Sequence, residues 1–289
     1  MISIIGIGNA ASAIAGEFAA TKNYQVYKLG SEIEKTVLSK REYKLKSFST
    51  PEEYEQNIPN LTKFFKDVND RVQVFVVGSS YSSNYCLGIL QQLKDKEIDL
   101  FYVKPDIDLL TGVPQLMEKV VFSVMQEYAR SGLLKSITLL SNQELEKIVG
   151  DVPIKTYYEV LNKTIFSMVH YLNFFEFGEP EIGQVTQPSE INRIRSVARL
   201  NMKNLEEKWF FDLDTPRELC YYLCINQETL ESDGSMHRRI VEMLKNKPRN
   251  SYRNISYAIY ETEFEDFGFC VAHTNVIQSQ KTLDSLETE

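Results

Sequence analysis

Short apolar runs alternate with amphipathic segments along residues 1–140 of the chain. The run at 72–77 is almost continuously apolar, which is typical of a strand that is buried on both faces of a sheet. Further strands are predicted at 2–7, 24–29, 43–48, 99–103 and 136–140. Helices are predicted after the turn at 8–12, from Thr50-Pro51 onward, at about 61–68, from 84 to 93 and at 114–130. This alternation favours an α/β fold with a Rossmann-like parallel sheet, in which ligands bind at the carboxyl ends of the strands.

The segment 153–177 interrupts this alternation. It contains no glycine and no proline after Pro153, and Gly178 and Pro180 mark its end, so the pattern predicts one long helix. Apolar residues lie on all sides of that helix rather than along one stripe. Because a helix of this kind must bury every side, we predict a central core helix that is packed between two domains.

The remainder of the chain mixes both kinds of element. A polar loop is predicted at 178–189, helices at about 190–198 and 235–246, strands at 221–225, 254–260 and 268–274, and a polar tail at 278–289. This pattern indicates a smaller α+β domain. The predicted organisation is a parallel-sheet domain over 1–152, the core helix over 153–177 and the α+β domain over 178–289.

Composition and charge disfavour several classes of protein. With 43% hydrophobic and 25% charged residues, the 289-residue chain is typical of a globular protein. A net charge of −8 and the absence of a Lys/Arg-rich run argue against nucleic-acid binding. No apolar run reaches the roughly 18–20 residues that span a membrane, and the N-terminus has no basic leader. We therefore expect a cytoplasmic protein without a nucleic-acid or membrane partner.

The cysteines and histidines show no metal-binding or catalytic spacing. The four cysteines include no CxxC pair, and the three histidines form no HExxH motif. A zinc site and a Ser or Cys hydrolase are therefore disfavoured, and no metal ligand is predicted. The cysteines are expected to be buried free thiols in a reducing compartment. They are Cys86, Cys220, Cys224 and Cys270.

A turn of small residues follows the first predicted strand and opens a helix. Small side chains let backbone N–H groups approach a phosphate, and a helix N-terminus attracts anions. Glycines at such a junction can equally serve only for packing. The third glycine of a GxGxxG motif is absent, which argues against a dinucleotide-dependent oxidoreductase. The candidate phosphate-binding residues here, named the first turn, are Gly8, Asn9, Ala10, Ala11 and Ser12.

A second turn of small residues follows the strand at 72–77. Its serines offer hydroxyl and amide groups to an anion, although serine is also common where a helix begins. Two such turns at the carboxyl edge of one sheet suggest an extended anionic ligand such as a di- or triphosphate. The candidate residues here, named the second turn, are Gly78, Ser79, Ser80, Tyr81, Ser82 and Ser83.

Three further polar or aromatic residues are candidates for recognition of a sugar or base. Asn142 follows the strand at 136–140 and either caps the next helix or faces a ligand. Tyr158 and Asn162 are four residues apart on the predicted long helix, so they face the same way. An aromatic ring and an amide suit a purine site. The alternative is that Tyr158 belongs to the core and Asn162 is hydrogen-bonded locally.

The stretch 141–162 resembles the tubulin/FtsZ superfamily. Asn142-Gln143-Glu144-Leu145 is similar to the Asn-Glu-Ala-Leu run of tubulin, and Tyr158-Glu159-Val160-Leu161-Asn162 is similar to Tyr-Gly-Asp-Leu-Asn. The resemblance implies that Asn142 contacts a nucleotide, Tyr158 stacks on guanine and Asn162 reads the base edge. GNAASAIA from Gly8 also resembles the phosphate loop GQAGNQIG, and Lys104-Pro105 resembles a Lys-Pro pair of FtsZ.

The chain also departs from the tubulin pattern. The signature GGGTGSG appears as GSSYSSN, in which the bulky Tyr81 stands in place of threonine. The run GQVTQP at 183–188 resembles Gly-Gln-Leu-Asn-Ala-Asp, so Pro188 stands where the family has a catalytic acid. Glu190 is the nearest carboxylate and could act only if the register shifted. Since hydrolysis needs exact placement of water, binding is expected to be better preserved than catalysis.

Taken together, the resemblance implies a guanine-nucleotide-binding protein of prokaryotic or phage type. The domain over 1–152 would bind GTP or GDP, with Mg²⁺ as a candidate companion ion. The protein would associate with itself head to tail into cytoskeletal filaments, with weak or absent hydrolysis. The alternative is a structural scaffold that kept the fold and lost nucleotide turnover. An unrelated nucleotide-dependent enzyme is a further alternative, for which no catalytic base is apparent.

Overall fold

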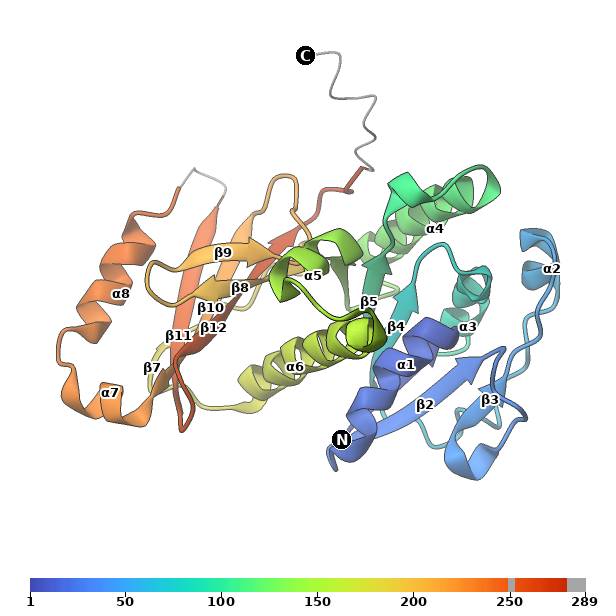
Figure 1. Cartoon of the computed structure of the whole chain (residues 1–289), viewed down its shortest axis with the longest axis horizontal. Coiled ribbons are helices and arrows are strands. Elements are labelled where there is room, and N and C mark those ends of the chain that lie inside the picture. The colour runs from blue at the N-terminus through green and yellow to red at the C-terminus, as the bar shows by residue number, and fades with distance from the viewer. Residues whose placement is uncertain (249–252, 280–289) are drawn as a thin grey trace, which may run out of the picture. The chain divides into compact units, whose positions relative to one another are not determined.

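The computed structural model describes residues 1–248 and 253–279 (Figure 1). The chain forms two compact units. The first contains Met1–Ile137 together with residues 276–279, and the second is Thr138–Asn275. The predicted boundaries at 152/153 and 177/178 do not coincide with this division, because it falls inside strand β6 (Ser136–Ser141).

The first unit is built on a parallel sheet, as predicted. Its strands lie in the order β3-β2-β1-β4-β5, and each pairs with its neighbour in parallel. Strands β1 and β4 are neighbours in this sheet, and the first turn follows β1 while the second turn follows β4. The strands are β1 (Ile2–Ile7), β2 (Tyr24–Gly30), β3 (Glu42–Lys44), β4 (Arg71–Val77) and β5 (Glu97–Lys104).

Four α-helices of the first unit connect these strands. The start of α2 was correctly predicted, because Thr50 and Glu53 form a reciprocal capping box. A helix at 61–68 was predicted wrongly, since this segment consists of turns. The adjacent side chains Phe64 and Phe65 both pack against Tyr27, at 5.5 and 6.1 Å between ring centroids, which neighbouring positions of a helix do not favour. The helices are α1 (Asn9–Glu17), α2 (Pro51–Gln56), α3 (Cys86–Gln91) and α4 (Val113–Arg130).

The second unit combines helices with a mainly antiparallel sheet. Its strands lie in the order β8-β12-β10-β11-β7, with β9 paired to β8, and only β10 and β11 run parallel. The helices are α5 (Asn142–Val149), α6 (Tyr157–Phe177), α7 (Gln227–Ser232) and α8 (Met236–Lys245). The strands are β7 (Ile182–Gln184), β8 (Ile194–Asn201), β9 (Glu206–Trp209), β10 (Glu218–Asn226), β11 (Asn254–Thr262) and β12 (Phe267–Thr274).

One strand of this unit occupies a segment for which a helix was predicted. Residues 190–198 are not helical: a turn comes first and β8 then begins at Ile194. The strand pairs with β12 on one side and with β9 on the other. Ladder pairing on both edges therefore overrides the local helical preference.

The long helix α6 is present but is not buried on every side, so that part of the prediction is wrong. Its buried residues are Leu161, Ile165, Met168, Val169, Asn173 and Phe175. Other aromatic residues are open to solvent, with Tyr158 75% exposed and Phe177 69% exposed. Within its own unit the helix packs one side against the sheet, where Phe175 stacks on Tyr222 at 4.9 Å between ring centroids.

The cysteines behave as predicted. Cys86 lies in the first unit, while Cys220, Cys224 and Cys270 lie in the second. All four thiols are free and buried. Burial raises the pKa of the Cys86 thiol, so the unreactive protonated form prevails.

Candidate functional site

The first turn joins β1 to α1 through Gly8. The backbone of Gly8 has a φ of 99°, a conformation that side chains disfavour, and its N–H donates to Leu29 O at 2.8 Å. Helix α1 begins directly afterwards without a side-chain cap. The first N–H groups of a helix have no partner within the helix, so this end of α1 is suited to an anion.

Two side chains of the first turn support the scaffold. The Ser12 hydroxyl is buried and donates to Gly6 O at 3.2 Å and Leu29 O at 3.1 Å. The Asn9 side chain donates to Ser31 Oγ at 3.1 Å and accepts from the Glu32 N–H at 3.2 Å. What the first turn presents to a ligand is therefore backbone, because Ala10 and Ala11 carry only methyl groups.

The second turn has a strained start followed by a 3₁₀ helix. Ser79 has a φ of 57°, in the left-handed region that favours glycine. The Ser80 hydroxyl donates to Val77 O at 3.2 Å, and the Ser83 hydroxyl donates to Ser80 O at 2.6 Å. The 3₁₀ helix Tyr81–Tyr85 leads into α3. Two of the serines in the second turn therefore have a structural role, because their hydroxyls hydrogen-bond to nearby backbone carbonyl groups.

Tyr81, the first residue of the 3₁₀ helix, packs against another element. Its ring is 48% exposed and stacks on Tyr54 of α2, with 6.3 Å between centroids and 22° between planes. The bulky Tyr81 side chain is therefore accommodated by packing against α2.

The two turns follow the adjacent strands β1 and β4 and lie against each other. A Cβ added to Gly8 would lie 3.2 Å from Ser82 Cβ and 3.6 Å from Ser80 Oγ. Glycine at position 8 is what permits this close approach. The first unit therefore brings an uncapped helix N-terminus and a serine-rich turn to one place at the carboxyl ends of β1 and β4.

A buried acidic residue lies behind the second turn. The Tyr102 hydroxyl donates to Glu118 Oε2 at 2.8 Å, and both side chains are completely buried. Burial raises the pKa of Glu118, whereas hydrogen bonds from Tyr102 and the Ser79 N–H and the charge of Lys104 oppose that rise. Burial also lowers the pKa of Lys104, opposed by the charges of Glu118 and Asp108.

The apolar pattern of α4 contains a sequence signal for Glu118. On α4, position 118 falls on the same face as the buried Val121, Phe122, Met125 and Ala129. An acid on the apolar face of a helix is a polar group that needs partners in the core. For Lys104, the only sequence signal is the resemblance of Lys104-Pro105 to the Lys-Pro pair of FtsZ.

The candidate base-recognition residues all lie in the second unit. Asn142 is the first residue of α5 and makes no side-chain cap. Tyr158 is 75% exposed and meets Tyr157 edge-on, with 5.1 Å between ring centroids. The Asn162 side chain lies one turn further along α6, half-buried. Within residues 1–248 and 253–279, neither Asn142 nor Asn162 has a side-chain hydrogen bond.

A purely structural role was the alternative for each of these three residues, and the structure does not support it. Tyr158 is not a core residue, Asn162 is not hydrogen-bonded locally, and Asn142 does not cap α5. The neighbouring Tyr157 is engaged instead, since its hydroxyl donates to Glu146. Burial and the Glu146 carboxylate raise the pKa of Tyr157 to about 12.

The segment after α6 contains Pro188 and Glu190. The Glu218 carboxylate accepts from the Ser189 N–H at 3.0 Å and from Asn192 Nδ2 at 2.8 Å. Glu190, between these two anchored residues, is exposed. A register shift that moved Glu190 to the place of Pro188 would break both contacts, so the structure opposes it.

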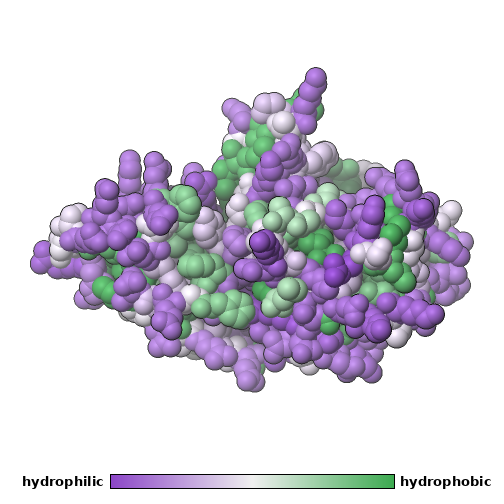
Figure 2. Space-filling model, turned by 90° about the horizontal axis from the view of Figure 1, so that it is seen from below, coloured by the Kyte–Doolittle hydropathy of each residue, from purple (hydrophilic) through white to green (hydrophobic). Residues whose placement is uncertain are grey.

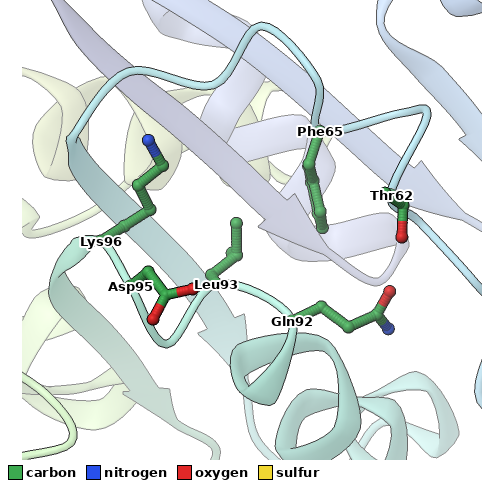
Figure 3. Close-up of a pocket in the computed structure, with 6 residues that line it drawn as sticks. All are labelled: Thr62, Phe65, Gln92, Leu93, Asp95 and Lys96. Atoms are coloured by element: carbon green, nitrogen blue, oxygen red, sulfur yellow. The ribbon is translucent and has the colours of Figure 1, made fainter.

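A surface hollow of about 200 Å³ lies elsewhere in the first unit (Figure 3). It lies at the amino-terminal end of β5, whereas both turns follow carboxyl ends, so it does not coincide with them. Its lining residues are Thr62, Phe65, Gln92, Leu93, Asp95 and Lys96. In the described part of the chain, no cluster of His, Cys, Asp and Glu could hold a metal ion, and no helix is long and apolar enough to cross a membrane.

Solved structures of known proteins share this architecture. GDP-form protofilaments of Bacillus thuringiensis serovar israelensis TubZ match with a TM-score of 0.69 at 14% identity, over 96% of this chain and 88% of that chain. The chain has a tubulin/FtsZ-like fold. CetZ from Methanosaeta thermophila strain DSM 6194 matches with a TM-score of 0.64 at 12% identity, over 99% and 88% of the two chains. An empty FtsZ dimer of M. jannaschii matches with a TM-score of 0.63 at 12% identity, over 94% of this chain and 88% of that chain.

No family model matches the chain, and no curated protein matches its sequence. The tubulin/FtsZ-like fold and the α/β class inferred from the sequence are nevertheless confirmed by the structural matches. At identities of 12–14%, the likeness of these tubulin-like structures is one of fold.

Proposed function

We propose that this protein binds a guanine nucleotide and self-associates head to tail into filaments, with weak or absent hydrolysis. The observation that carries the proposal is the meeting of Gly8 with Ser80 and Ser82, beside the uncapped N-terminus of α1. Such a place suits the phosphates of a nucleotide. The same fold occurs in TubZ protofilaments solved in GTPγS and GDP forms.

Base recognition is assigned to Tyr158, Asn162 and Asn142. An exposed ring offers a surface for stacking, and an amide without a partner among the described residues offers both a donor and an acceptor to a purine edge. In this proposal the phosphates are held by residues 8–12 and 78–83. Mg²⁺ would act with the phosphates of the nucleotide.

Weak or absent hydrolysis is proposed because the segment after α6 lacks a suitably placed acid. Proline at 188 cannot ionise or orient water, and Glu218 holds the flanking residues in their present register. Glu190 is then a carboxylate without a defined position for catalysis, so general-base assistance is not expected.

Self-association is supported by exposed apolar side chains as well as by the fold. Leu109 is 80% exposed and Leu116 is 64% exposed, near the start of α4. Figure 2 shows hydrophobic groups that reach the surface between hydrophilic side chains. Four-stranded and two-stranded filaments of TubZ share the fold. A head-to-tail contact between identical subunits repeats without closing and yields a filament.

The decisive experiment is a titration with a fluorescent guanine nucleotide, with and without magnesium. Saturable binding that unlabelled GTP and GDP displace and ATP does not is the expected result. Equal displacement by ATP would refute base recognition by Tyr158 and Asn162. No saturable binding under either condition would refute the proposed nucleotide site as a whole.

The second candidate function is a scaffold that kept the fold and does not turn over nucleotide. Pro188 and the anchoring of Ser189 by Glu218 favour it. Sedimentation and electron microscopy with GTP, with GDP and without nucleotide separate the two functions. Filaments that form equally well without nucleotide would favour the scaffold, whereas nucleotide-dependent filaments support the first proposal.

A further inference from the structure

The second turn rests on a carboxylate of its own chain. Glu118 is fully buried, and its Oε2 accepts a hydrogen bond from the Tyr102 hydroxyl at 2.8 Å. The backbone N–H of Ser79 donates to the same carboxyl group. A Cβ added to Gly78 would lie 2.1 Å from Glu118 Oε2, so glycine is required for the turn to approach the carboxylate this closely.

In this arrangement Glu118 occupies a backbone N–H group that an anion-binding turn would otherwise offer to its ligand. Backbone N–H groups of such turns normally point at a phosphate. Here the N–H of Ser79 is committed to Glu118, and Ser79 adopts a φ of 57° that a residue with a Cβ disfavours. The contact with Glu118 therefore helps to hold the turn in a conformation that it would not adopt by itself.

The carboxylate also contributes charge. Burial raises the pKa of Glu118 above the ordinary value of a carboxyl, while the donors Tyr102 and Ser79 and the positive charge of Lys104 favour the ionised form and limit that rise. Glu118 Oε1 is buried and has no hydrogen-bond partner among the described residues, so the negative charge is only partly compensated by hydrogen bonds. Solvent and salt screen a buried charge much less than an exposed one.

We propose that Glu118 is a specificity-determining residue, which makes the site prefer a nucleoside diphosphate to the corresponding triphosphate. The proposal rests on the nucleotide binding proposed above. A triphosphate brings additional negative charge to turns that already lie on a carboxylate, and the committed N–H of Ser79 offers it no compensation. Both effects weaken triphosphate binding more than diphosphate binding.

The test compares the affinities of GDP and of a non-hydrolysable GTP analogue at pH 8 without magnesium. Glu118→Gln removes the charge and keeps the size and an acceptor for Ser79. Asp99→Asn is the matched control, since Asp99 is also a buried acid (2% exposed) but lies near the amino-terminal end of β5. In Glu118→Gln the ratio of triphosphate to diphosphate affinity should rise about tenfold, or about 1.4 kcal/mol. In Asp99→Asn it should not change.

The ratio separates failure of this inference from failure of the proposed function. If both nucleotides bind and the ratio in Glu118→Gln equals that of the wild type, the role of Glu118 is refuted while nucleotide binding stands. If the wild-type protein binds neither nucleotide, the proposed function is refuted and the inference with it. Should Glu118→Gln not fold, Glu118→Met offers an uncharged chain of similar length, for which the same rise in the ratio is expected.

Discussion

Asn162 shows at the scale of a single residue why an unused polar group is informative. It follows the buried Leu161 on α6, is itself half-buried, and its amide makes no hydrogen bond within the described residues. Its amide atoms are not among the fully buried polar atoms without a partner, so they keep contact with solvent. A ligand that bonds to this amide replaces water rather than an intramolecular partner, so binding can use a group that the fold itself does not need.

Asn162→Ala should therefore weaken guanine-nucleotide binding roughly tenfold or more, as expected for the loss of one or two hydrogen bonds in a desolvated complex. The melting temperature should hardly change, because no intramolecular bond is lost. Asn173→Ala is the control on the same helix, since Asn173 is 5% exposed and engaged within the protein. It should lower the melting temperature and leave the affinity unchanged. The opposite pattern would identify Asn162 as a structural residue.

The residue types of the candidate site could be selected from the sequence, but their environments could not. Tyr158 was one of many aromatic residues on a helix that was predicted to be buried all round, and only the fold shows that its ring is open to solvent. Ser12 is a small residue of the first turn, like Gly8 and Ala11, yet its hydroxyl is already used by Gly6 and Leu29. Such differences depend on contacts between segments far apart in sequence, which a local pattern does not contain.

At the scale of elements, the Glu218 carboxylate anchors two residues of the segment between β7 and β8. Glu218→Ala should free Ser189 and Asn192, and we expect faster amide hydrogen exchange over residues 185–192. Glu190→Ala is the control, because Glu190 is exposed and should leave this exchange unchanged. Unchanged protection in Glu218→Ala would show that the segment is held by other contacts.

A buried histidine on β12 should make the second unit sensitive to acid. Burial and the charge of Arg195 lower the pKa of His273 from 6.5 to about 3, despite a hydrogen bond with the Asn192 backbone. The folded state thus prefers the neutral ring. The stability that this preference contributes is complete above about pH 6.5 and is lost as the pH falls toward 3.

Urea unfolding between pH 7 and pH 4 tests this prediction. The wild type should lose a few kcal/mol of stability from this group over that range, and His273→Gln should show a flatter profile. His237→Gln, at an exposed histidine of α8, should retain the wild-type slope. An equally steep profile in His273→Gln would assign the acid sensitivity to other groups.

The elements that the sequence predicted well are those with a clear local cause. Strand β4 is apolar over most of its length and is buried over Val72–Val76, and α2 begins at a capping box. The failures have a common origin in tertiary contacts. Residues 61–68 fold around aromatic contacts with Tyr27, and β8 gains ladder partners on both edges. The exposed aromatic side of α6 could not be predicted, because its apolar residues are distributed all round the helix.

At the scale of the whole molecule, assembly is the property that follows least directly from one chain. We expect the protein to sediment as filaments with guanine nucleotide above a critical concentration. Leu116→Lys should raise that concentration severalfold, since it places a charge on a side chain that is 64% exposed in the single chain. Lys119→Glu, also at an exposed position of α4, is a control for altered charge. If Leu116→Lys assembles like the wild type, Leu116 lies outside the contact.

The rate at which each of the four buried thiols reacts with a reagent reports how often the surrounding part of the protein opens. A maleimide can react with Cys86 only when the first unit opens, and with Cys220, Cys224 or Cys270 only when the second unit does. Modification followed by mass spectrometry would therefore measure the opening rates of the two units separately, in the wild-type protein. Because Cys86 begins α3, directly after the 3₁₀ helix of the second turn, a bound nucleotide should slow that one reaction most.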